Sequence, residues 1–152
     1  MVFPFPAPMR IALDAAAAAA RLGEVPVGAV VTRGEDVISV AANETRTMND
    51  PTAHAEIVAI RAACEKLGSD RLTGCALWVT LEPCAMCAGA IAHARIGRLY
   101  YAASDPKGGG VEHGARVFSH PTCHHGPEVT SGLAEREAAD LLRDFFLARR
   151  AR

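Results

Sequence analysis

The sequence predicts an α/β protein in which a mixed β-sheet carries helices on both faces, giving three layers. Its composition is that of a globular chain, with 50% hydrophobic and only 5% aromatic residues. Two adjacent apolar segments predict a β-hairpin, and later apolar segments alternate with helical ones, which is the pattern of a mixed sheet. A length of 152 residues suits one core, so we expect residues 1–152 to form a single domain.

The first part of the chain predicts a helix followed by a hairpin. Residues 9–22 are rich in alanine, the best helix former, and Gly23 is a helix stop. Residues 26–32 and 37–42 are apolar and flank a short turn, so they predict two antiparallel strands. The polar residues 43–50 predict a loop.

The middle of the chain predicts a second helix and a third strand. We expect the helix to begin at Pro51, with Asp50 as its N-cap, and to end at Leu67 before Gly68. Residues 76–80 form a short apolar run that predicts a buried strand.

The last part of the chain alternates helix and strand around a long irregular segment. Pro83 favours a helix start, and Gly, Pro and His are frequent between the last two strands. The expected elements are a helix over 84–94, a strand over 98–103, an irregular segment over 104–127, a short strand over 128–130 and an amphipathic helix over 133–150.

Charge and hydropathy exclude some classes of protein. The formal net charge of −1 gives no global signal for nucleic acid. The basic residues 149–152 predict either a solvated helix end or a local RNA contact. No apolar stretch reaches 18 residues, and the alanine run at 15–20 lies between charged residues. We therefore expect a cytoplasmic protein without a transmembrane helix or a signal peptide.

The cysteines predict metal chemistry better than disulfides. Five cysteines, an odd number, argue against a disulfide framework, and Cys64 and Cys75 are most simply small buried apolar residues. Cys84 and Cys87 lie at a helix start with the i, i+3 spacing that shares one face. Two thiolates there can chelate zinc, and the helix N-terminus favours their charge. Taken alone, the pair could also be a redox pair or two core cysteines.

A second helix start supplies the rest of a catalytic zinc site. His54 with Cys84 and Cys87 gives three ligands and leaves the fourth position for water, whose pKa zinc lowers towards about 7. Glu56 is the expected proton shuttle, taking a proton from water and delivering protons to the ring nitrogen and the departing amine. Its alternative role is an acid favoured by the helix dipole. His-x-Glu combined with Pro-Cys-x-x-Cys is the known pattern of zinc deaminases.

Further stretches extend the match along nearly the whole chain. They are 24–30, 50–56, 79–90 and 94–98, together with Tyr100-Tyr101, Asp105 with Lys107, and Phe145-Phe146 with Arg149-Arg150. These stretches resemble the bacterial tRNA-specific adenosine deaminases of the cytidine-deaminase-like superfamily. The resemblance implies a cytidine-deaminase-like α/β/α fold with a mixed five-stranded sheet, one zinc ion per subunit and a homodimer. It also implies that the substrate is a tRNA anticodon stem-loop, whose wobble adenosine, usually in an arginine tRNA, becomes inosine.

The resemblance implies substrate contacts as well. Asn43 would hydrogen-bond the target nucleoside, and Val27 and Leu81 would line its pocket. Asp105 and Lys107 would lie near the flanking nucleotides. On spacing alone, Asn43 could equally be a turn residue. Val27 and Leu81 could be core residues, and Asp105 and Lys107 could be ordinary turn residues before glycines.

The resemblance also places four C-terminal residues over the RNA, namely Phe145, Phe146, Arg149 and Arg150. Because adjacent residues on a helix face different directions, we expect at least one of the two phenylalanines in the core.

The segments 107–112 and 121–126 depart from the family pattern. Four residues there or beside them could bind a second metal or form polar surface: His120, Cys123, His124 and His125. Since imidazoles stack on bases, His120 or the pair His124-His125 is expected to contact RNA.

Two other functions remain open. A deaminase of free guanine, or of another nucleobase or nucleoside, would share His54, Glu56, Cys84 and Cys87. Activity on the free base without activity on RNA would favour it. A non-catalytic, zinc-structured RNA-binding module would have no use for Glu56 beside an open coordination position.

Overall fold

The β-sheet confirms the predicted fold class. The computed structural model of the chain describes residues 5–151, and within them five strands form one sheet in the order β2-β1-β3-β4-β5. The strands are β1 (Gly28–Arg33), β2 (Asp36–Ala42), β3 (Cys75–Leu81), β4 (Arg98–Ala103) and β5 (Glu128–Ser131). β1 runs antiparallel to both of its neighbours, whereas β3, β4 and β5 run parallel, so the sheet is mixed.

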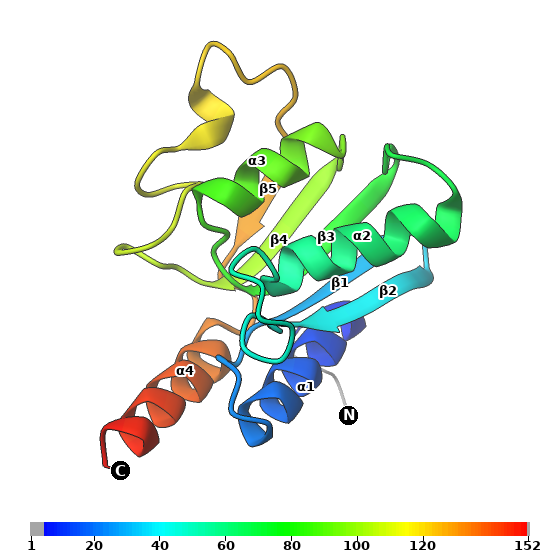
Figure 1. Cartoon of the computed structure of the whole chain (residues 1–152). Coiled ribbons are helices and arrows are strands. Elements are labelled where there is room, and N and C mark those ends of the chain that lie inside the picture. Colours follow the sequence, from blue (N-terminus) through cyan, green and yellow to red (C-terminus); the bar gives the residue numbers. More distant parts are fainter. Residues whose placement is uncertain (1–4, 152) are drawn as a thin grey trace.

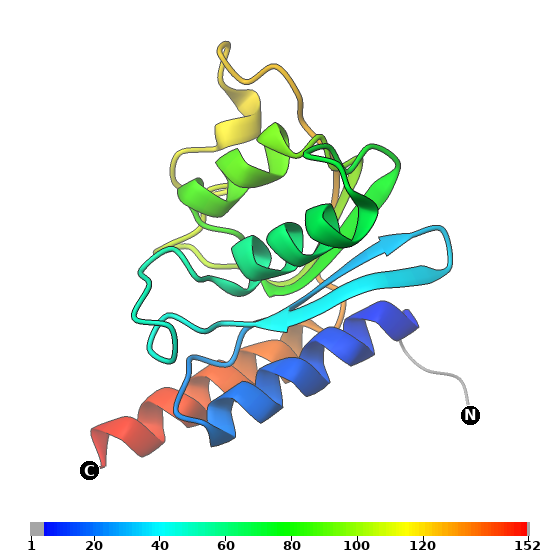
Figure 2. The ribbon, with the colours of Figure 1, turned by 45° about the vertical axis from the view of Figure 1, so that its right-hand side comes forward.

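Helices cover both faces of this sheet. Their bounds are α1 (Ala7–Arg21), α2 (Ala55–Leu67), α3 (Ala85–His93) and α4 (Glu135–Arg150), with a short 3-10 helix at Val117–Ser119. α1 and α4 lie on one face, and α2 and α3 lie on the other (Figure 1, Figure 2). Leu77 and Leu99 belong to the core under α2 and α3, and Met9 and Trp78 to the core under α1 and α4. Within residues 5–151, no helix combines the length and apolar character needed to cross a membrane.

Small residues let α1 pack closely on the sheet. A Cβ atom at Gly28 would overlap the carbonyl oxygen of Ala12. Ala12 and Ala16 are fully buried on the facing side of the helix. The alanine-rich composition therefore serves the close approach of two backbones as well as helix propensity.

The second helix begins four residues later than predicted. α2 starts at Ala55 with His54 in the N-cap position, and not at Pro51. Asp50 does not cap the helix, because its Oδ1 atom accepts hydrogen bonds from the N–H of Thr52 at 2.8 Å and from its hydroxyl at 2.7 Å. This Asx-type turn satisfies the acid locally and delays the helix.

The third helix also begins later, at Ala85, with Cys84 in the N-cap position. Neither His54 nor Cys84 uses its side chain to cap its helix, and both have extended backbone geometry. Both side chains are therefore free to point away from the helix axes and meet each other.

Candidate active site

α2 and α3 begin at the edge of the sheet where β3 and β4 end. These two strands run parallel, so their carboxyl ends meet at this edge. Ligand sites in α/β sheets commonly lie outside such ends. A pocket of about 330 Å³ opens there, lined by residues from both helix starts, from the entrance to β1 and from the segment after β4.

Three side chains converge beside this pocket. The Nδ1 atom of His54 lies 3.6 Å from the Sγ atom of Cys84 and 3.5 Å from that of Cys87, and all three atoms lie within 4.8 Å of one another. Tetrahedral bonds of about 2.0 Å to nitrogen and 2.3 Å to sulfur separate those ligand atoms by roughly 3.5 Å. The donor set and its spacing thus fit a zinc ion. Among residues 5–151, no other group of three His, Cys, Asp or Glu side chains converges this way.

The three side chains share protons through their mutual hydrogen bonds. Hydrogen bonds with Cys87 and His54 lower the pKa of the Cys84 thiol to about 4. The bond to Cys84, together with burial, raises the pKa of Cys87. A hydrogen bond with Cys84 raises the pKa of His54, against the effect of burial. Negative charge therefore collects on Cys84, and zinc binding would release the protons held by Cys87 and His54, because only a thiolate and a neutral imidazole are zinc ligands.

Glu56 lies in the first turn of α2, buried and at the wall of the pocket. It does not belong to the group of three ligand side chains. Burial raises the pKa of its carboxyl group, because a low-dielectric environment disfavours the charged form. A raised pKa makes the protonated form of the carboxyl group easier to reach, and a proton shuttle must pass through that form.

The structure brings Asn43, Val27 and Leu81 into the wall of the same pocket. Asn43 is buried, and its side-chain N–H2 group lies 3.5 Å from Oε1 of Glu24 and 3.3 Å from Oγ1 of Thr45. Val27 and Leu81 also contact the apolar core. Val27 and Leu81 are therefore both core residues and part of the pocket wall.

Asp105 and Lys107 differ in their relation to the pocket. Asp105 lines it, whereas Lys107 is exposed and does not. The Oδ1 atom of Asp105 accepts hydrogen bonds from the N–H groups of Lys107 at 3.2 Å and Gly108 at 2.9 Å. Asp105 is therefore also the organiser of a turn, as its spacing predicted.

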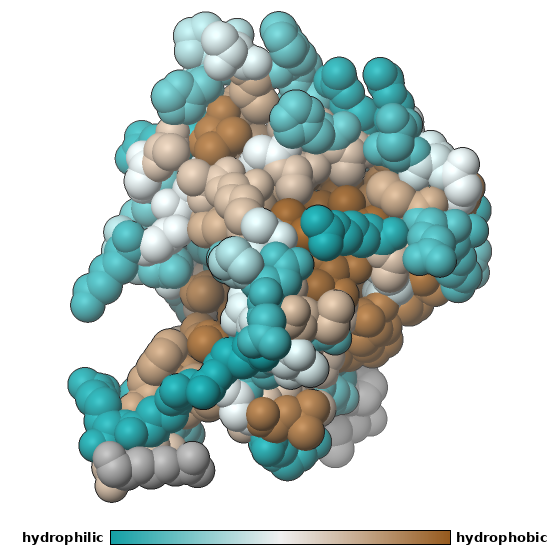
Figure 3. Space-filling view, viewed as in Figure 1, coloured by the Kyte–Doolittle hydropathy of each residue, from teal (hydrophilic) through white to brown (hydrophobic). Residues whose placement is uncertain are grey.

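The C-terminal residues lie outside the pocket lining. α4 projects from the body of the molecule, and its projecting end mixes hydrophilic and hydrophobic surface (Figure 1, Figure 3). Phe145 is half-buried and Phe146 is 45% exposed, so the prediction that one of them lies in the core is wrong. Their rings meet edge to face at 5.4 Å, and the guanidinium group of Arg149 lies 5.4 Å from the Phe145 ring. Arg150 is exposed, and Arg152 lies outside the described residues.

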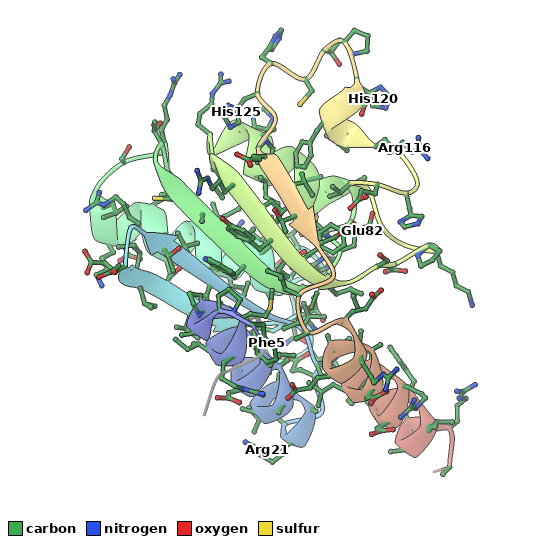
Figure 4. The ribbon with its side chains drawn as sticks, turned by 180° about the vertical axis from the view of Figure 1, so that it is seen from behind. Phe5, Arg21, Glu82, Arg116, His120 and His125 are labelled. Carbon is green, nitrogen blue, oxygen red and sulfur yellow. The ribbon has the colours of Figure 1, made fainter. Side chains whose placement is uncertain are left out.

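His120 lines a second cavity, of about 260 Å³, against α3. The same cavity is lined by Cys123, His124 and His125. His120 and His125 lie well away from Glu82, which borders the first pocket (Figure 4). Nε2 of His120 lies 2.6 Å from the carbonyl oxygen of Ala115, and Nε2 of His125 lies 2.7 Å from that of Ile96. Within residues 5–151 this cluster does not bring three ligand atoms to metal-binding distance.

Two buried carboxylates, Glu24 and Glu82, were not predicted, and Glu82 lines the pocket. Glu24 accepts hydrogen bonds from the N–H of Thr47 at 2.7 Å, from its hydroxyl at 2.6 Å and from the N–H of Arg46 at 3.2 Å. Glu82 accepts hydrogen bonds from the segment after β4. Both acids lie in stretches that resemble the family, 24–30 and 79–90, but their spacing does not distinguish them from other acids.

Comparisons with known proteins show which proteins this chain is similar to in sequence and fold. A tRNA-specific adenosine deaminase of Agrobacterium fabrum is 59% identical over 142 residues, which cover 93% of each chain. A solved structure from a study of A-to-I editing by tRNA:A34 deaminases at the wobble position superposes with a TM-score of 0.88 at 59% identity, covering 89% of this chain and 98% of that chain. A guanine deaminase from Nitrosomonas europaea superposes with a TM-score of 0.80 at 26% identity, covering 95% of this chain and 86% of that chain.

A family model described as MafB19-like deaminase matches residues 6–150, nearly the whole chain. The matched residues include all three converging side chains and Glu56. The chain therefore belongs to the MafB19-like deaminases, a family of hydrolytic enzymes.

Proposed function

We propose that this enzyme converts the wobble adenosine in the anticodon loop of a tRNA, with an arginine tRNA as the expected substrate, into inosine. The observation that carries the proposal is that Glu56 and two of the three converging side chains, His54 and Cys84, line one pocket. The relatives named as tRNA-specific adenosine deaminases, at 59% and 47% identity, support this choice of substrate.

His54, Cys84 and Cys87 would hold one zinc ion, which their spacing fits. When bound, zinc supplies a water of lowered pKa and leaves no need for a strong base. The three ligands fix the place of this chemistry, because they come from the starts of two helices packed on one sheet.

Glu56 would move the protons of the reaction. Its buried carboxyl group takes a proton from the attacking water and delivers it to the ring nitrogen N1 of adenine. It then takes the second proton of that water, from the new hydroxyl group on C6, and gives it to the departing amine, so that the hydroxyl becomes a carbonyl and the products are inosine and ammonia. Its raised pKa suits this double role, because the group must be a base in one step and an acid in the next.

The remaining contacts would orient the nucleotide and its neighbours. Val27 and Leu81 offer apolar walls for the purine, and Asn43 offers the amide that hydrogen-bonds it. Asp105 and Lys107 would lie beside the flanking nucleotides.

An anticodon loop suits such a site, because its bases can be splayed out of the stack at modest cost. Four residues on the projecting end of α4 would contact the RNA further from the pocket, namely Phe145, Phe146, Arg149 and Arg150. His120, in the separate cavity, would make a more distant contact. A homodimer in the cytoplasm, with one zinc ion per subunit, completes the proposal.

A second candidate is deamination of free guanine or another nucleobase. The superposition on a guanine deaminase at 26% identity favours keeping it, because that protein shares the fold.

Purified protein should be offered three substrates: an arginine tRNA stem-loop with adenosine at the wobble position, free adenosine and free guanine. We expect inosine in the stem-loop and little turnover of the free compounds. Turnover of guanine alone would overturn the tRNA assignment and keep the deaminase chemistry. If Glu56→Ala kept full biological activity, a non-catalytic RNA-binding module would be favoured.

A further inference from the structure

Glu82 is a buried acid at the sheet edge that the proposed chemistry does not use. It follows β3 directly and lies two residues before Cys84, and its side chain is 0% exposed. In Figure 4 it lies at the base of the segment that leads away from β4. We call residues 105–113 of this segment the 105–113 loop.

The carboxylate of Glu82 is saturated with donors from this loop. Its Oε1 atom accepts from the N–H of Asp105 at 3.0 Å and pairs with Nδ1 of His113 at 2.7 Å. Its Oε2 atom accepts from the N–H groups of Val111 at 3.2 Å, Glu112 at 3.0 Å and His113 at 3.1 Å. All five partners come from one loop, and four of them are backbone N–H donors, so a single side chain determines the path of that loop.

Four of the five partners of Glu82 are backbone N–H groups, which can only donate. These donors lie on both carboxyl oxygens, so both oxygens act as acceptors. Because the side chain is buried, removing one acceptor would leave a backbone N–H group without a partner.

The glycines of the loop pack against the same turn. A Cβ atom at Gly109 would lie 2.5 Å from the carboxyl group of Glu82, and one at Gly110 would lie 2.5 Å from the backbone nitrogen of Ala85. Gly110 also donates its N–H to the carbonyl oxygen of Pro83 at 2.8 Å. Side chains at these two positions would push the loop away from the turn that carries Cys84.

We infer that Glu82 is a positioning residue that joins the wall of the substrate pocket to the turn carrying the metal ligands. The 105–113 loop contributes Asp105 and Gly108 to the pocket that also contains His54 and Cys84. Tying the loop to Glu82 fixes the distance between this wall and the reacting centre. For its substrate the inference rests on the proposed function: the ligand held by this wall is the nucleotide of an RNA loop.

The test is Glu82→Gln, which keeps the size of the side chain and places an amide against backbone donors. The matched control is Glu112→Gln, on the same loop, where an exposed acid bonds the hydroxyl of Tyr101 and the amide oxygen can still accept that bond. Three quantities are measured: zinc content, amide hydrogen exchange, and kcat and KM on the wobble-adenosine stem-loop.

We expect Glu82→Gln to keep its zinc and to lose exchange protection selectively at the amides of Asp105, Val111, Glu112 and His113. KM for the stem-loop should rise by roughly 10–100-fold, with a much smaller change in kcat, because the wall moves and Glu56 does not. The control should match the wild type in all three measurements. A purely structural role would instead lower zinc content or protection throughout the sheet, and either result would overturn the inference.

Other outcomes are equally decisive. Unchanged exchange in the 105–113 loop would show that Glu82 does not hold it. Increased exchange with an unchanged KM would show that the loop is not a substrate wall. If Glu82→Gln fails to fold, His113→Ala removes only the side-chain contact of His113 with Glu82 and should produce a smaller change in the same direction. If the wild type does not act on the stem-loop, the proposed function fails, and the exchange measurement still decides whether Glu82 holds the loop.

Discussion

Glu24→Gln is expected to lower the free energy of unfolding by about 2–4 kcal/mol. The carboxylate of Glu24 is buried, and one of its oxygens accepts both the N–H and the hydroxyl of Thr47. Glutamine replaces one of the two carboxylate oxygens with an N–H2 group, which cannot accept. The N–H of Thr47 or of Arg46 then loses its acceptor. An unsatisfied buried donor costs about 1–3 kcal/mol, and the loss of charge in the remaining bonds adds about 1 kcal/mol.

Urea denaturation at neutral pH measures this difference, with Glu35→Gln as the control. Glu35 is exposed in the hairpin turn, so its substitution should change stability by less than about 0.5 kcal/mol. In thermal melts, a chain of this size should lose roughly 6–12 °C with Glu24→Gln. An unfolding free energy equal to that of the wild type would refute the assignment of Glu24 as a structural anchor.

The pH dependence supplies a second check with a fixed sign. Burial raises the pKa of Glu24, but hydrogen bonds from Thr47 and Arg46 outweigh it, so the folded-state pKa lies below the ordinary value. A lowered pKa contributes stability that is fully present above the unfolded-state pKa of about 4.3 and is lost as the pH falls through the folded-state value. The wild type and Glu24→Gln should therefore converge in acid. A difference that grows as the pH falls would contradict this.

Three further substitutions test the site and the fold. Glu56→Ala should keep its zinc and lower kcat by roughly 10²–10⁴-fold, since only proton transfer is lost; metal loss measured by elemental analysis would contradict the shuttle role. Cys87→Ala should lose the metal, and full zinc occupancy after dialysis would refute the ligand assignment. Gly28→Ala should destabilise the chain by about 1–3 kcal/mol in urea, because the new methyl group overlaps the backbone of Ala12; unchanged stability would show that α1 can shift at no cost.

Local patterns predicted most of the fold, and the failures have identifiable causes. The strand Arg98–Ala103 was predicted correctly at both ends, because no glycine, proline or turn residue interrupts the segment between Gly97 and Ser104. The start of α2 was misplaced because Asp50 and Pro51 make a good helix opening in isolation. In the folded chain Asp50 accepts hydrogen bonds from Thr52 and does not cap the helix.

The site shows the same division. The metal ligands could be predicted because residue type and spacing express their chemistry directly. Glu82 could not be identified, because its role depends on donors that lie 23 to 31 residues further along the chain. The prediction that Phe145 or Phe146 lies in the core also failed, since the sequence does not reveal that α4 extends beyond the body of the molecule. Long-range contacts, and not local propensity, decide these positions.

Position-resolved detection of inosine tests the central claim most directly. A mixture of bacterial tRNAs lacking inosine would be incubated with the zinc-loaded protein and, in parallel, with Glu56→Ala. We expect inosine at the wobble position of an arginine tRNA with the wild type and none with the variant. Inosine at other adenosines, no inosine at all, or equal amounts from both proteins would contradict it.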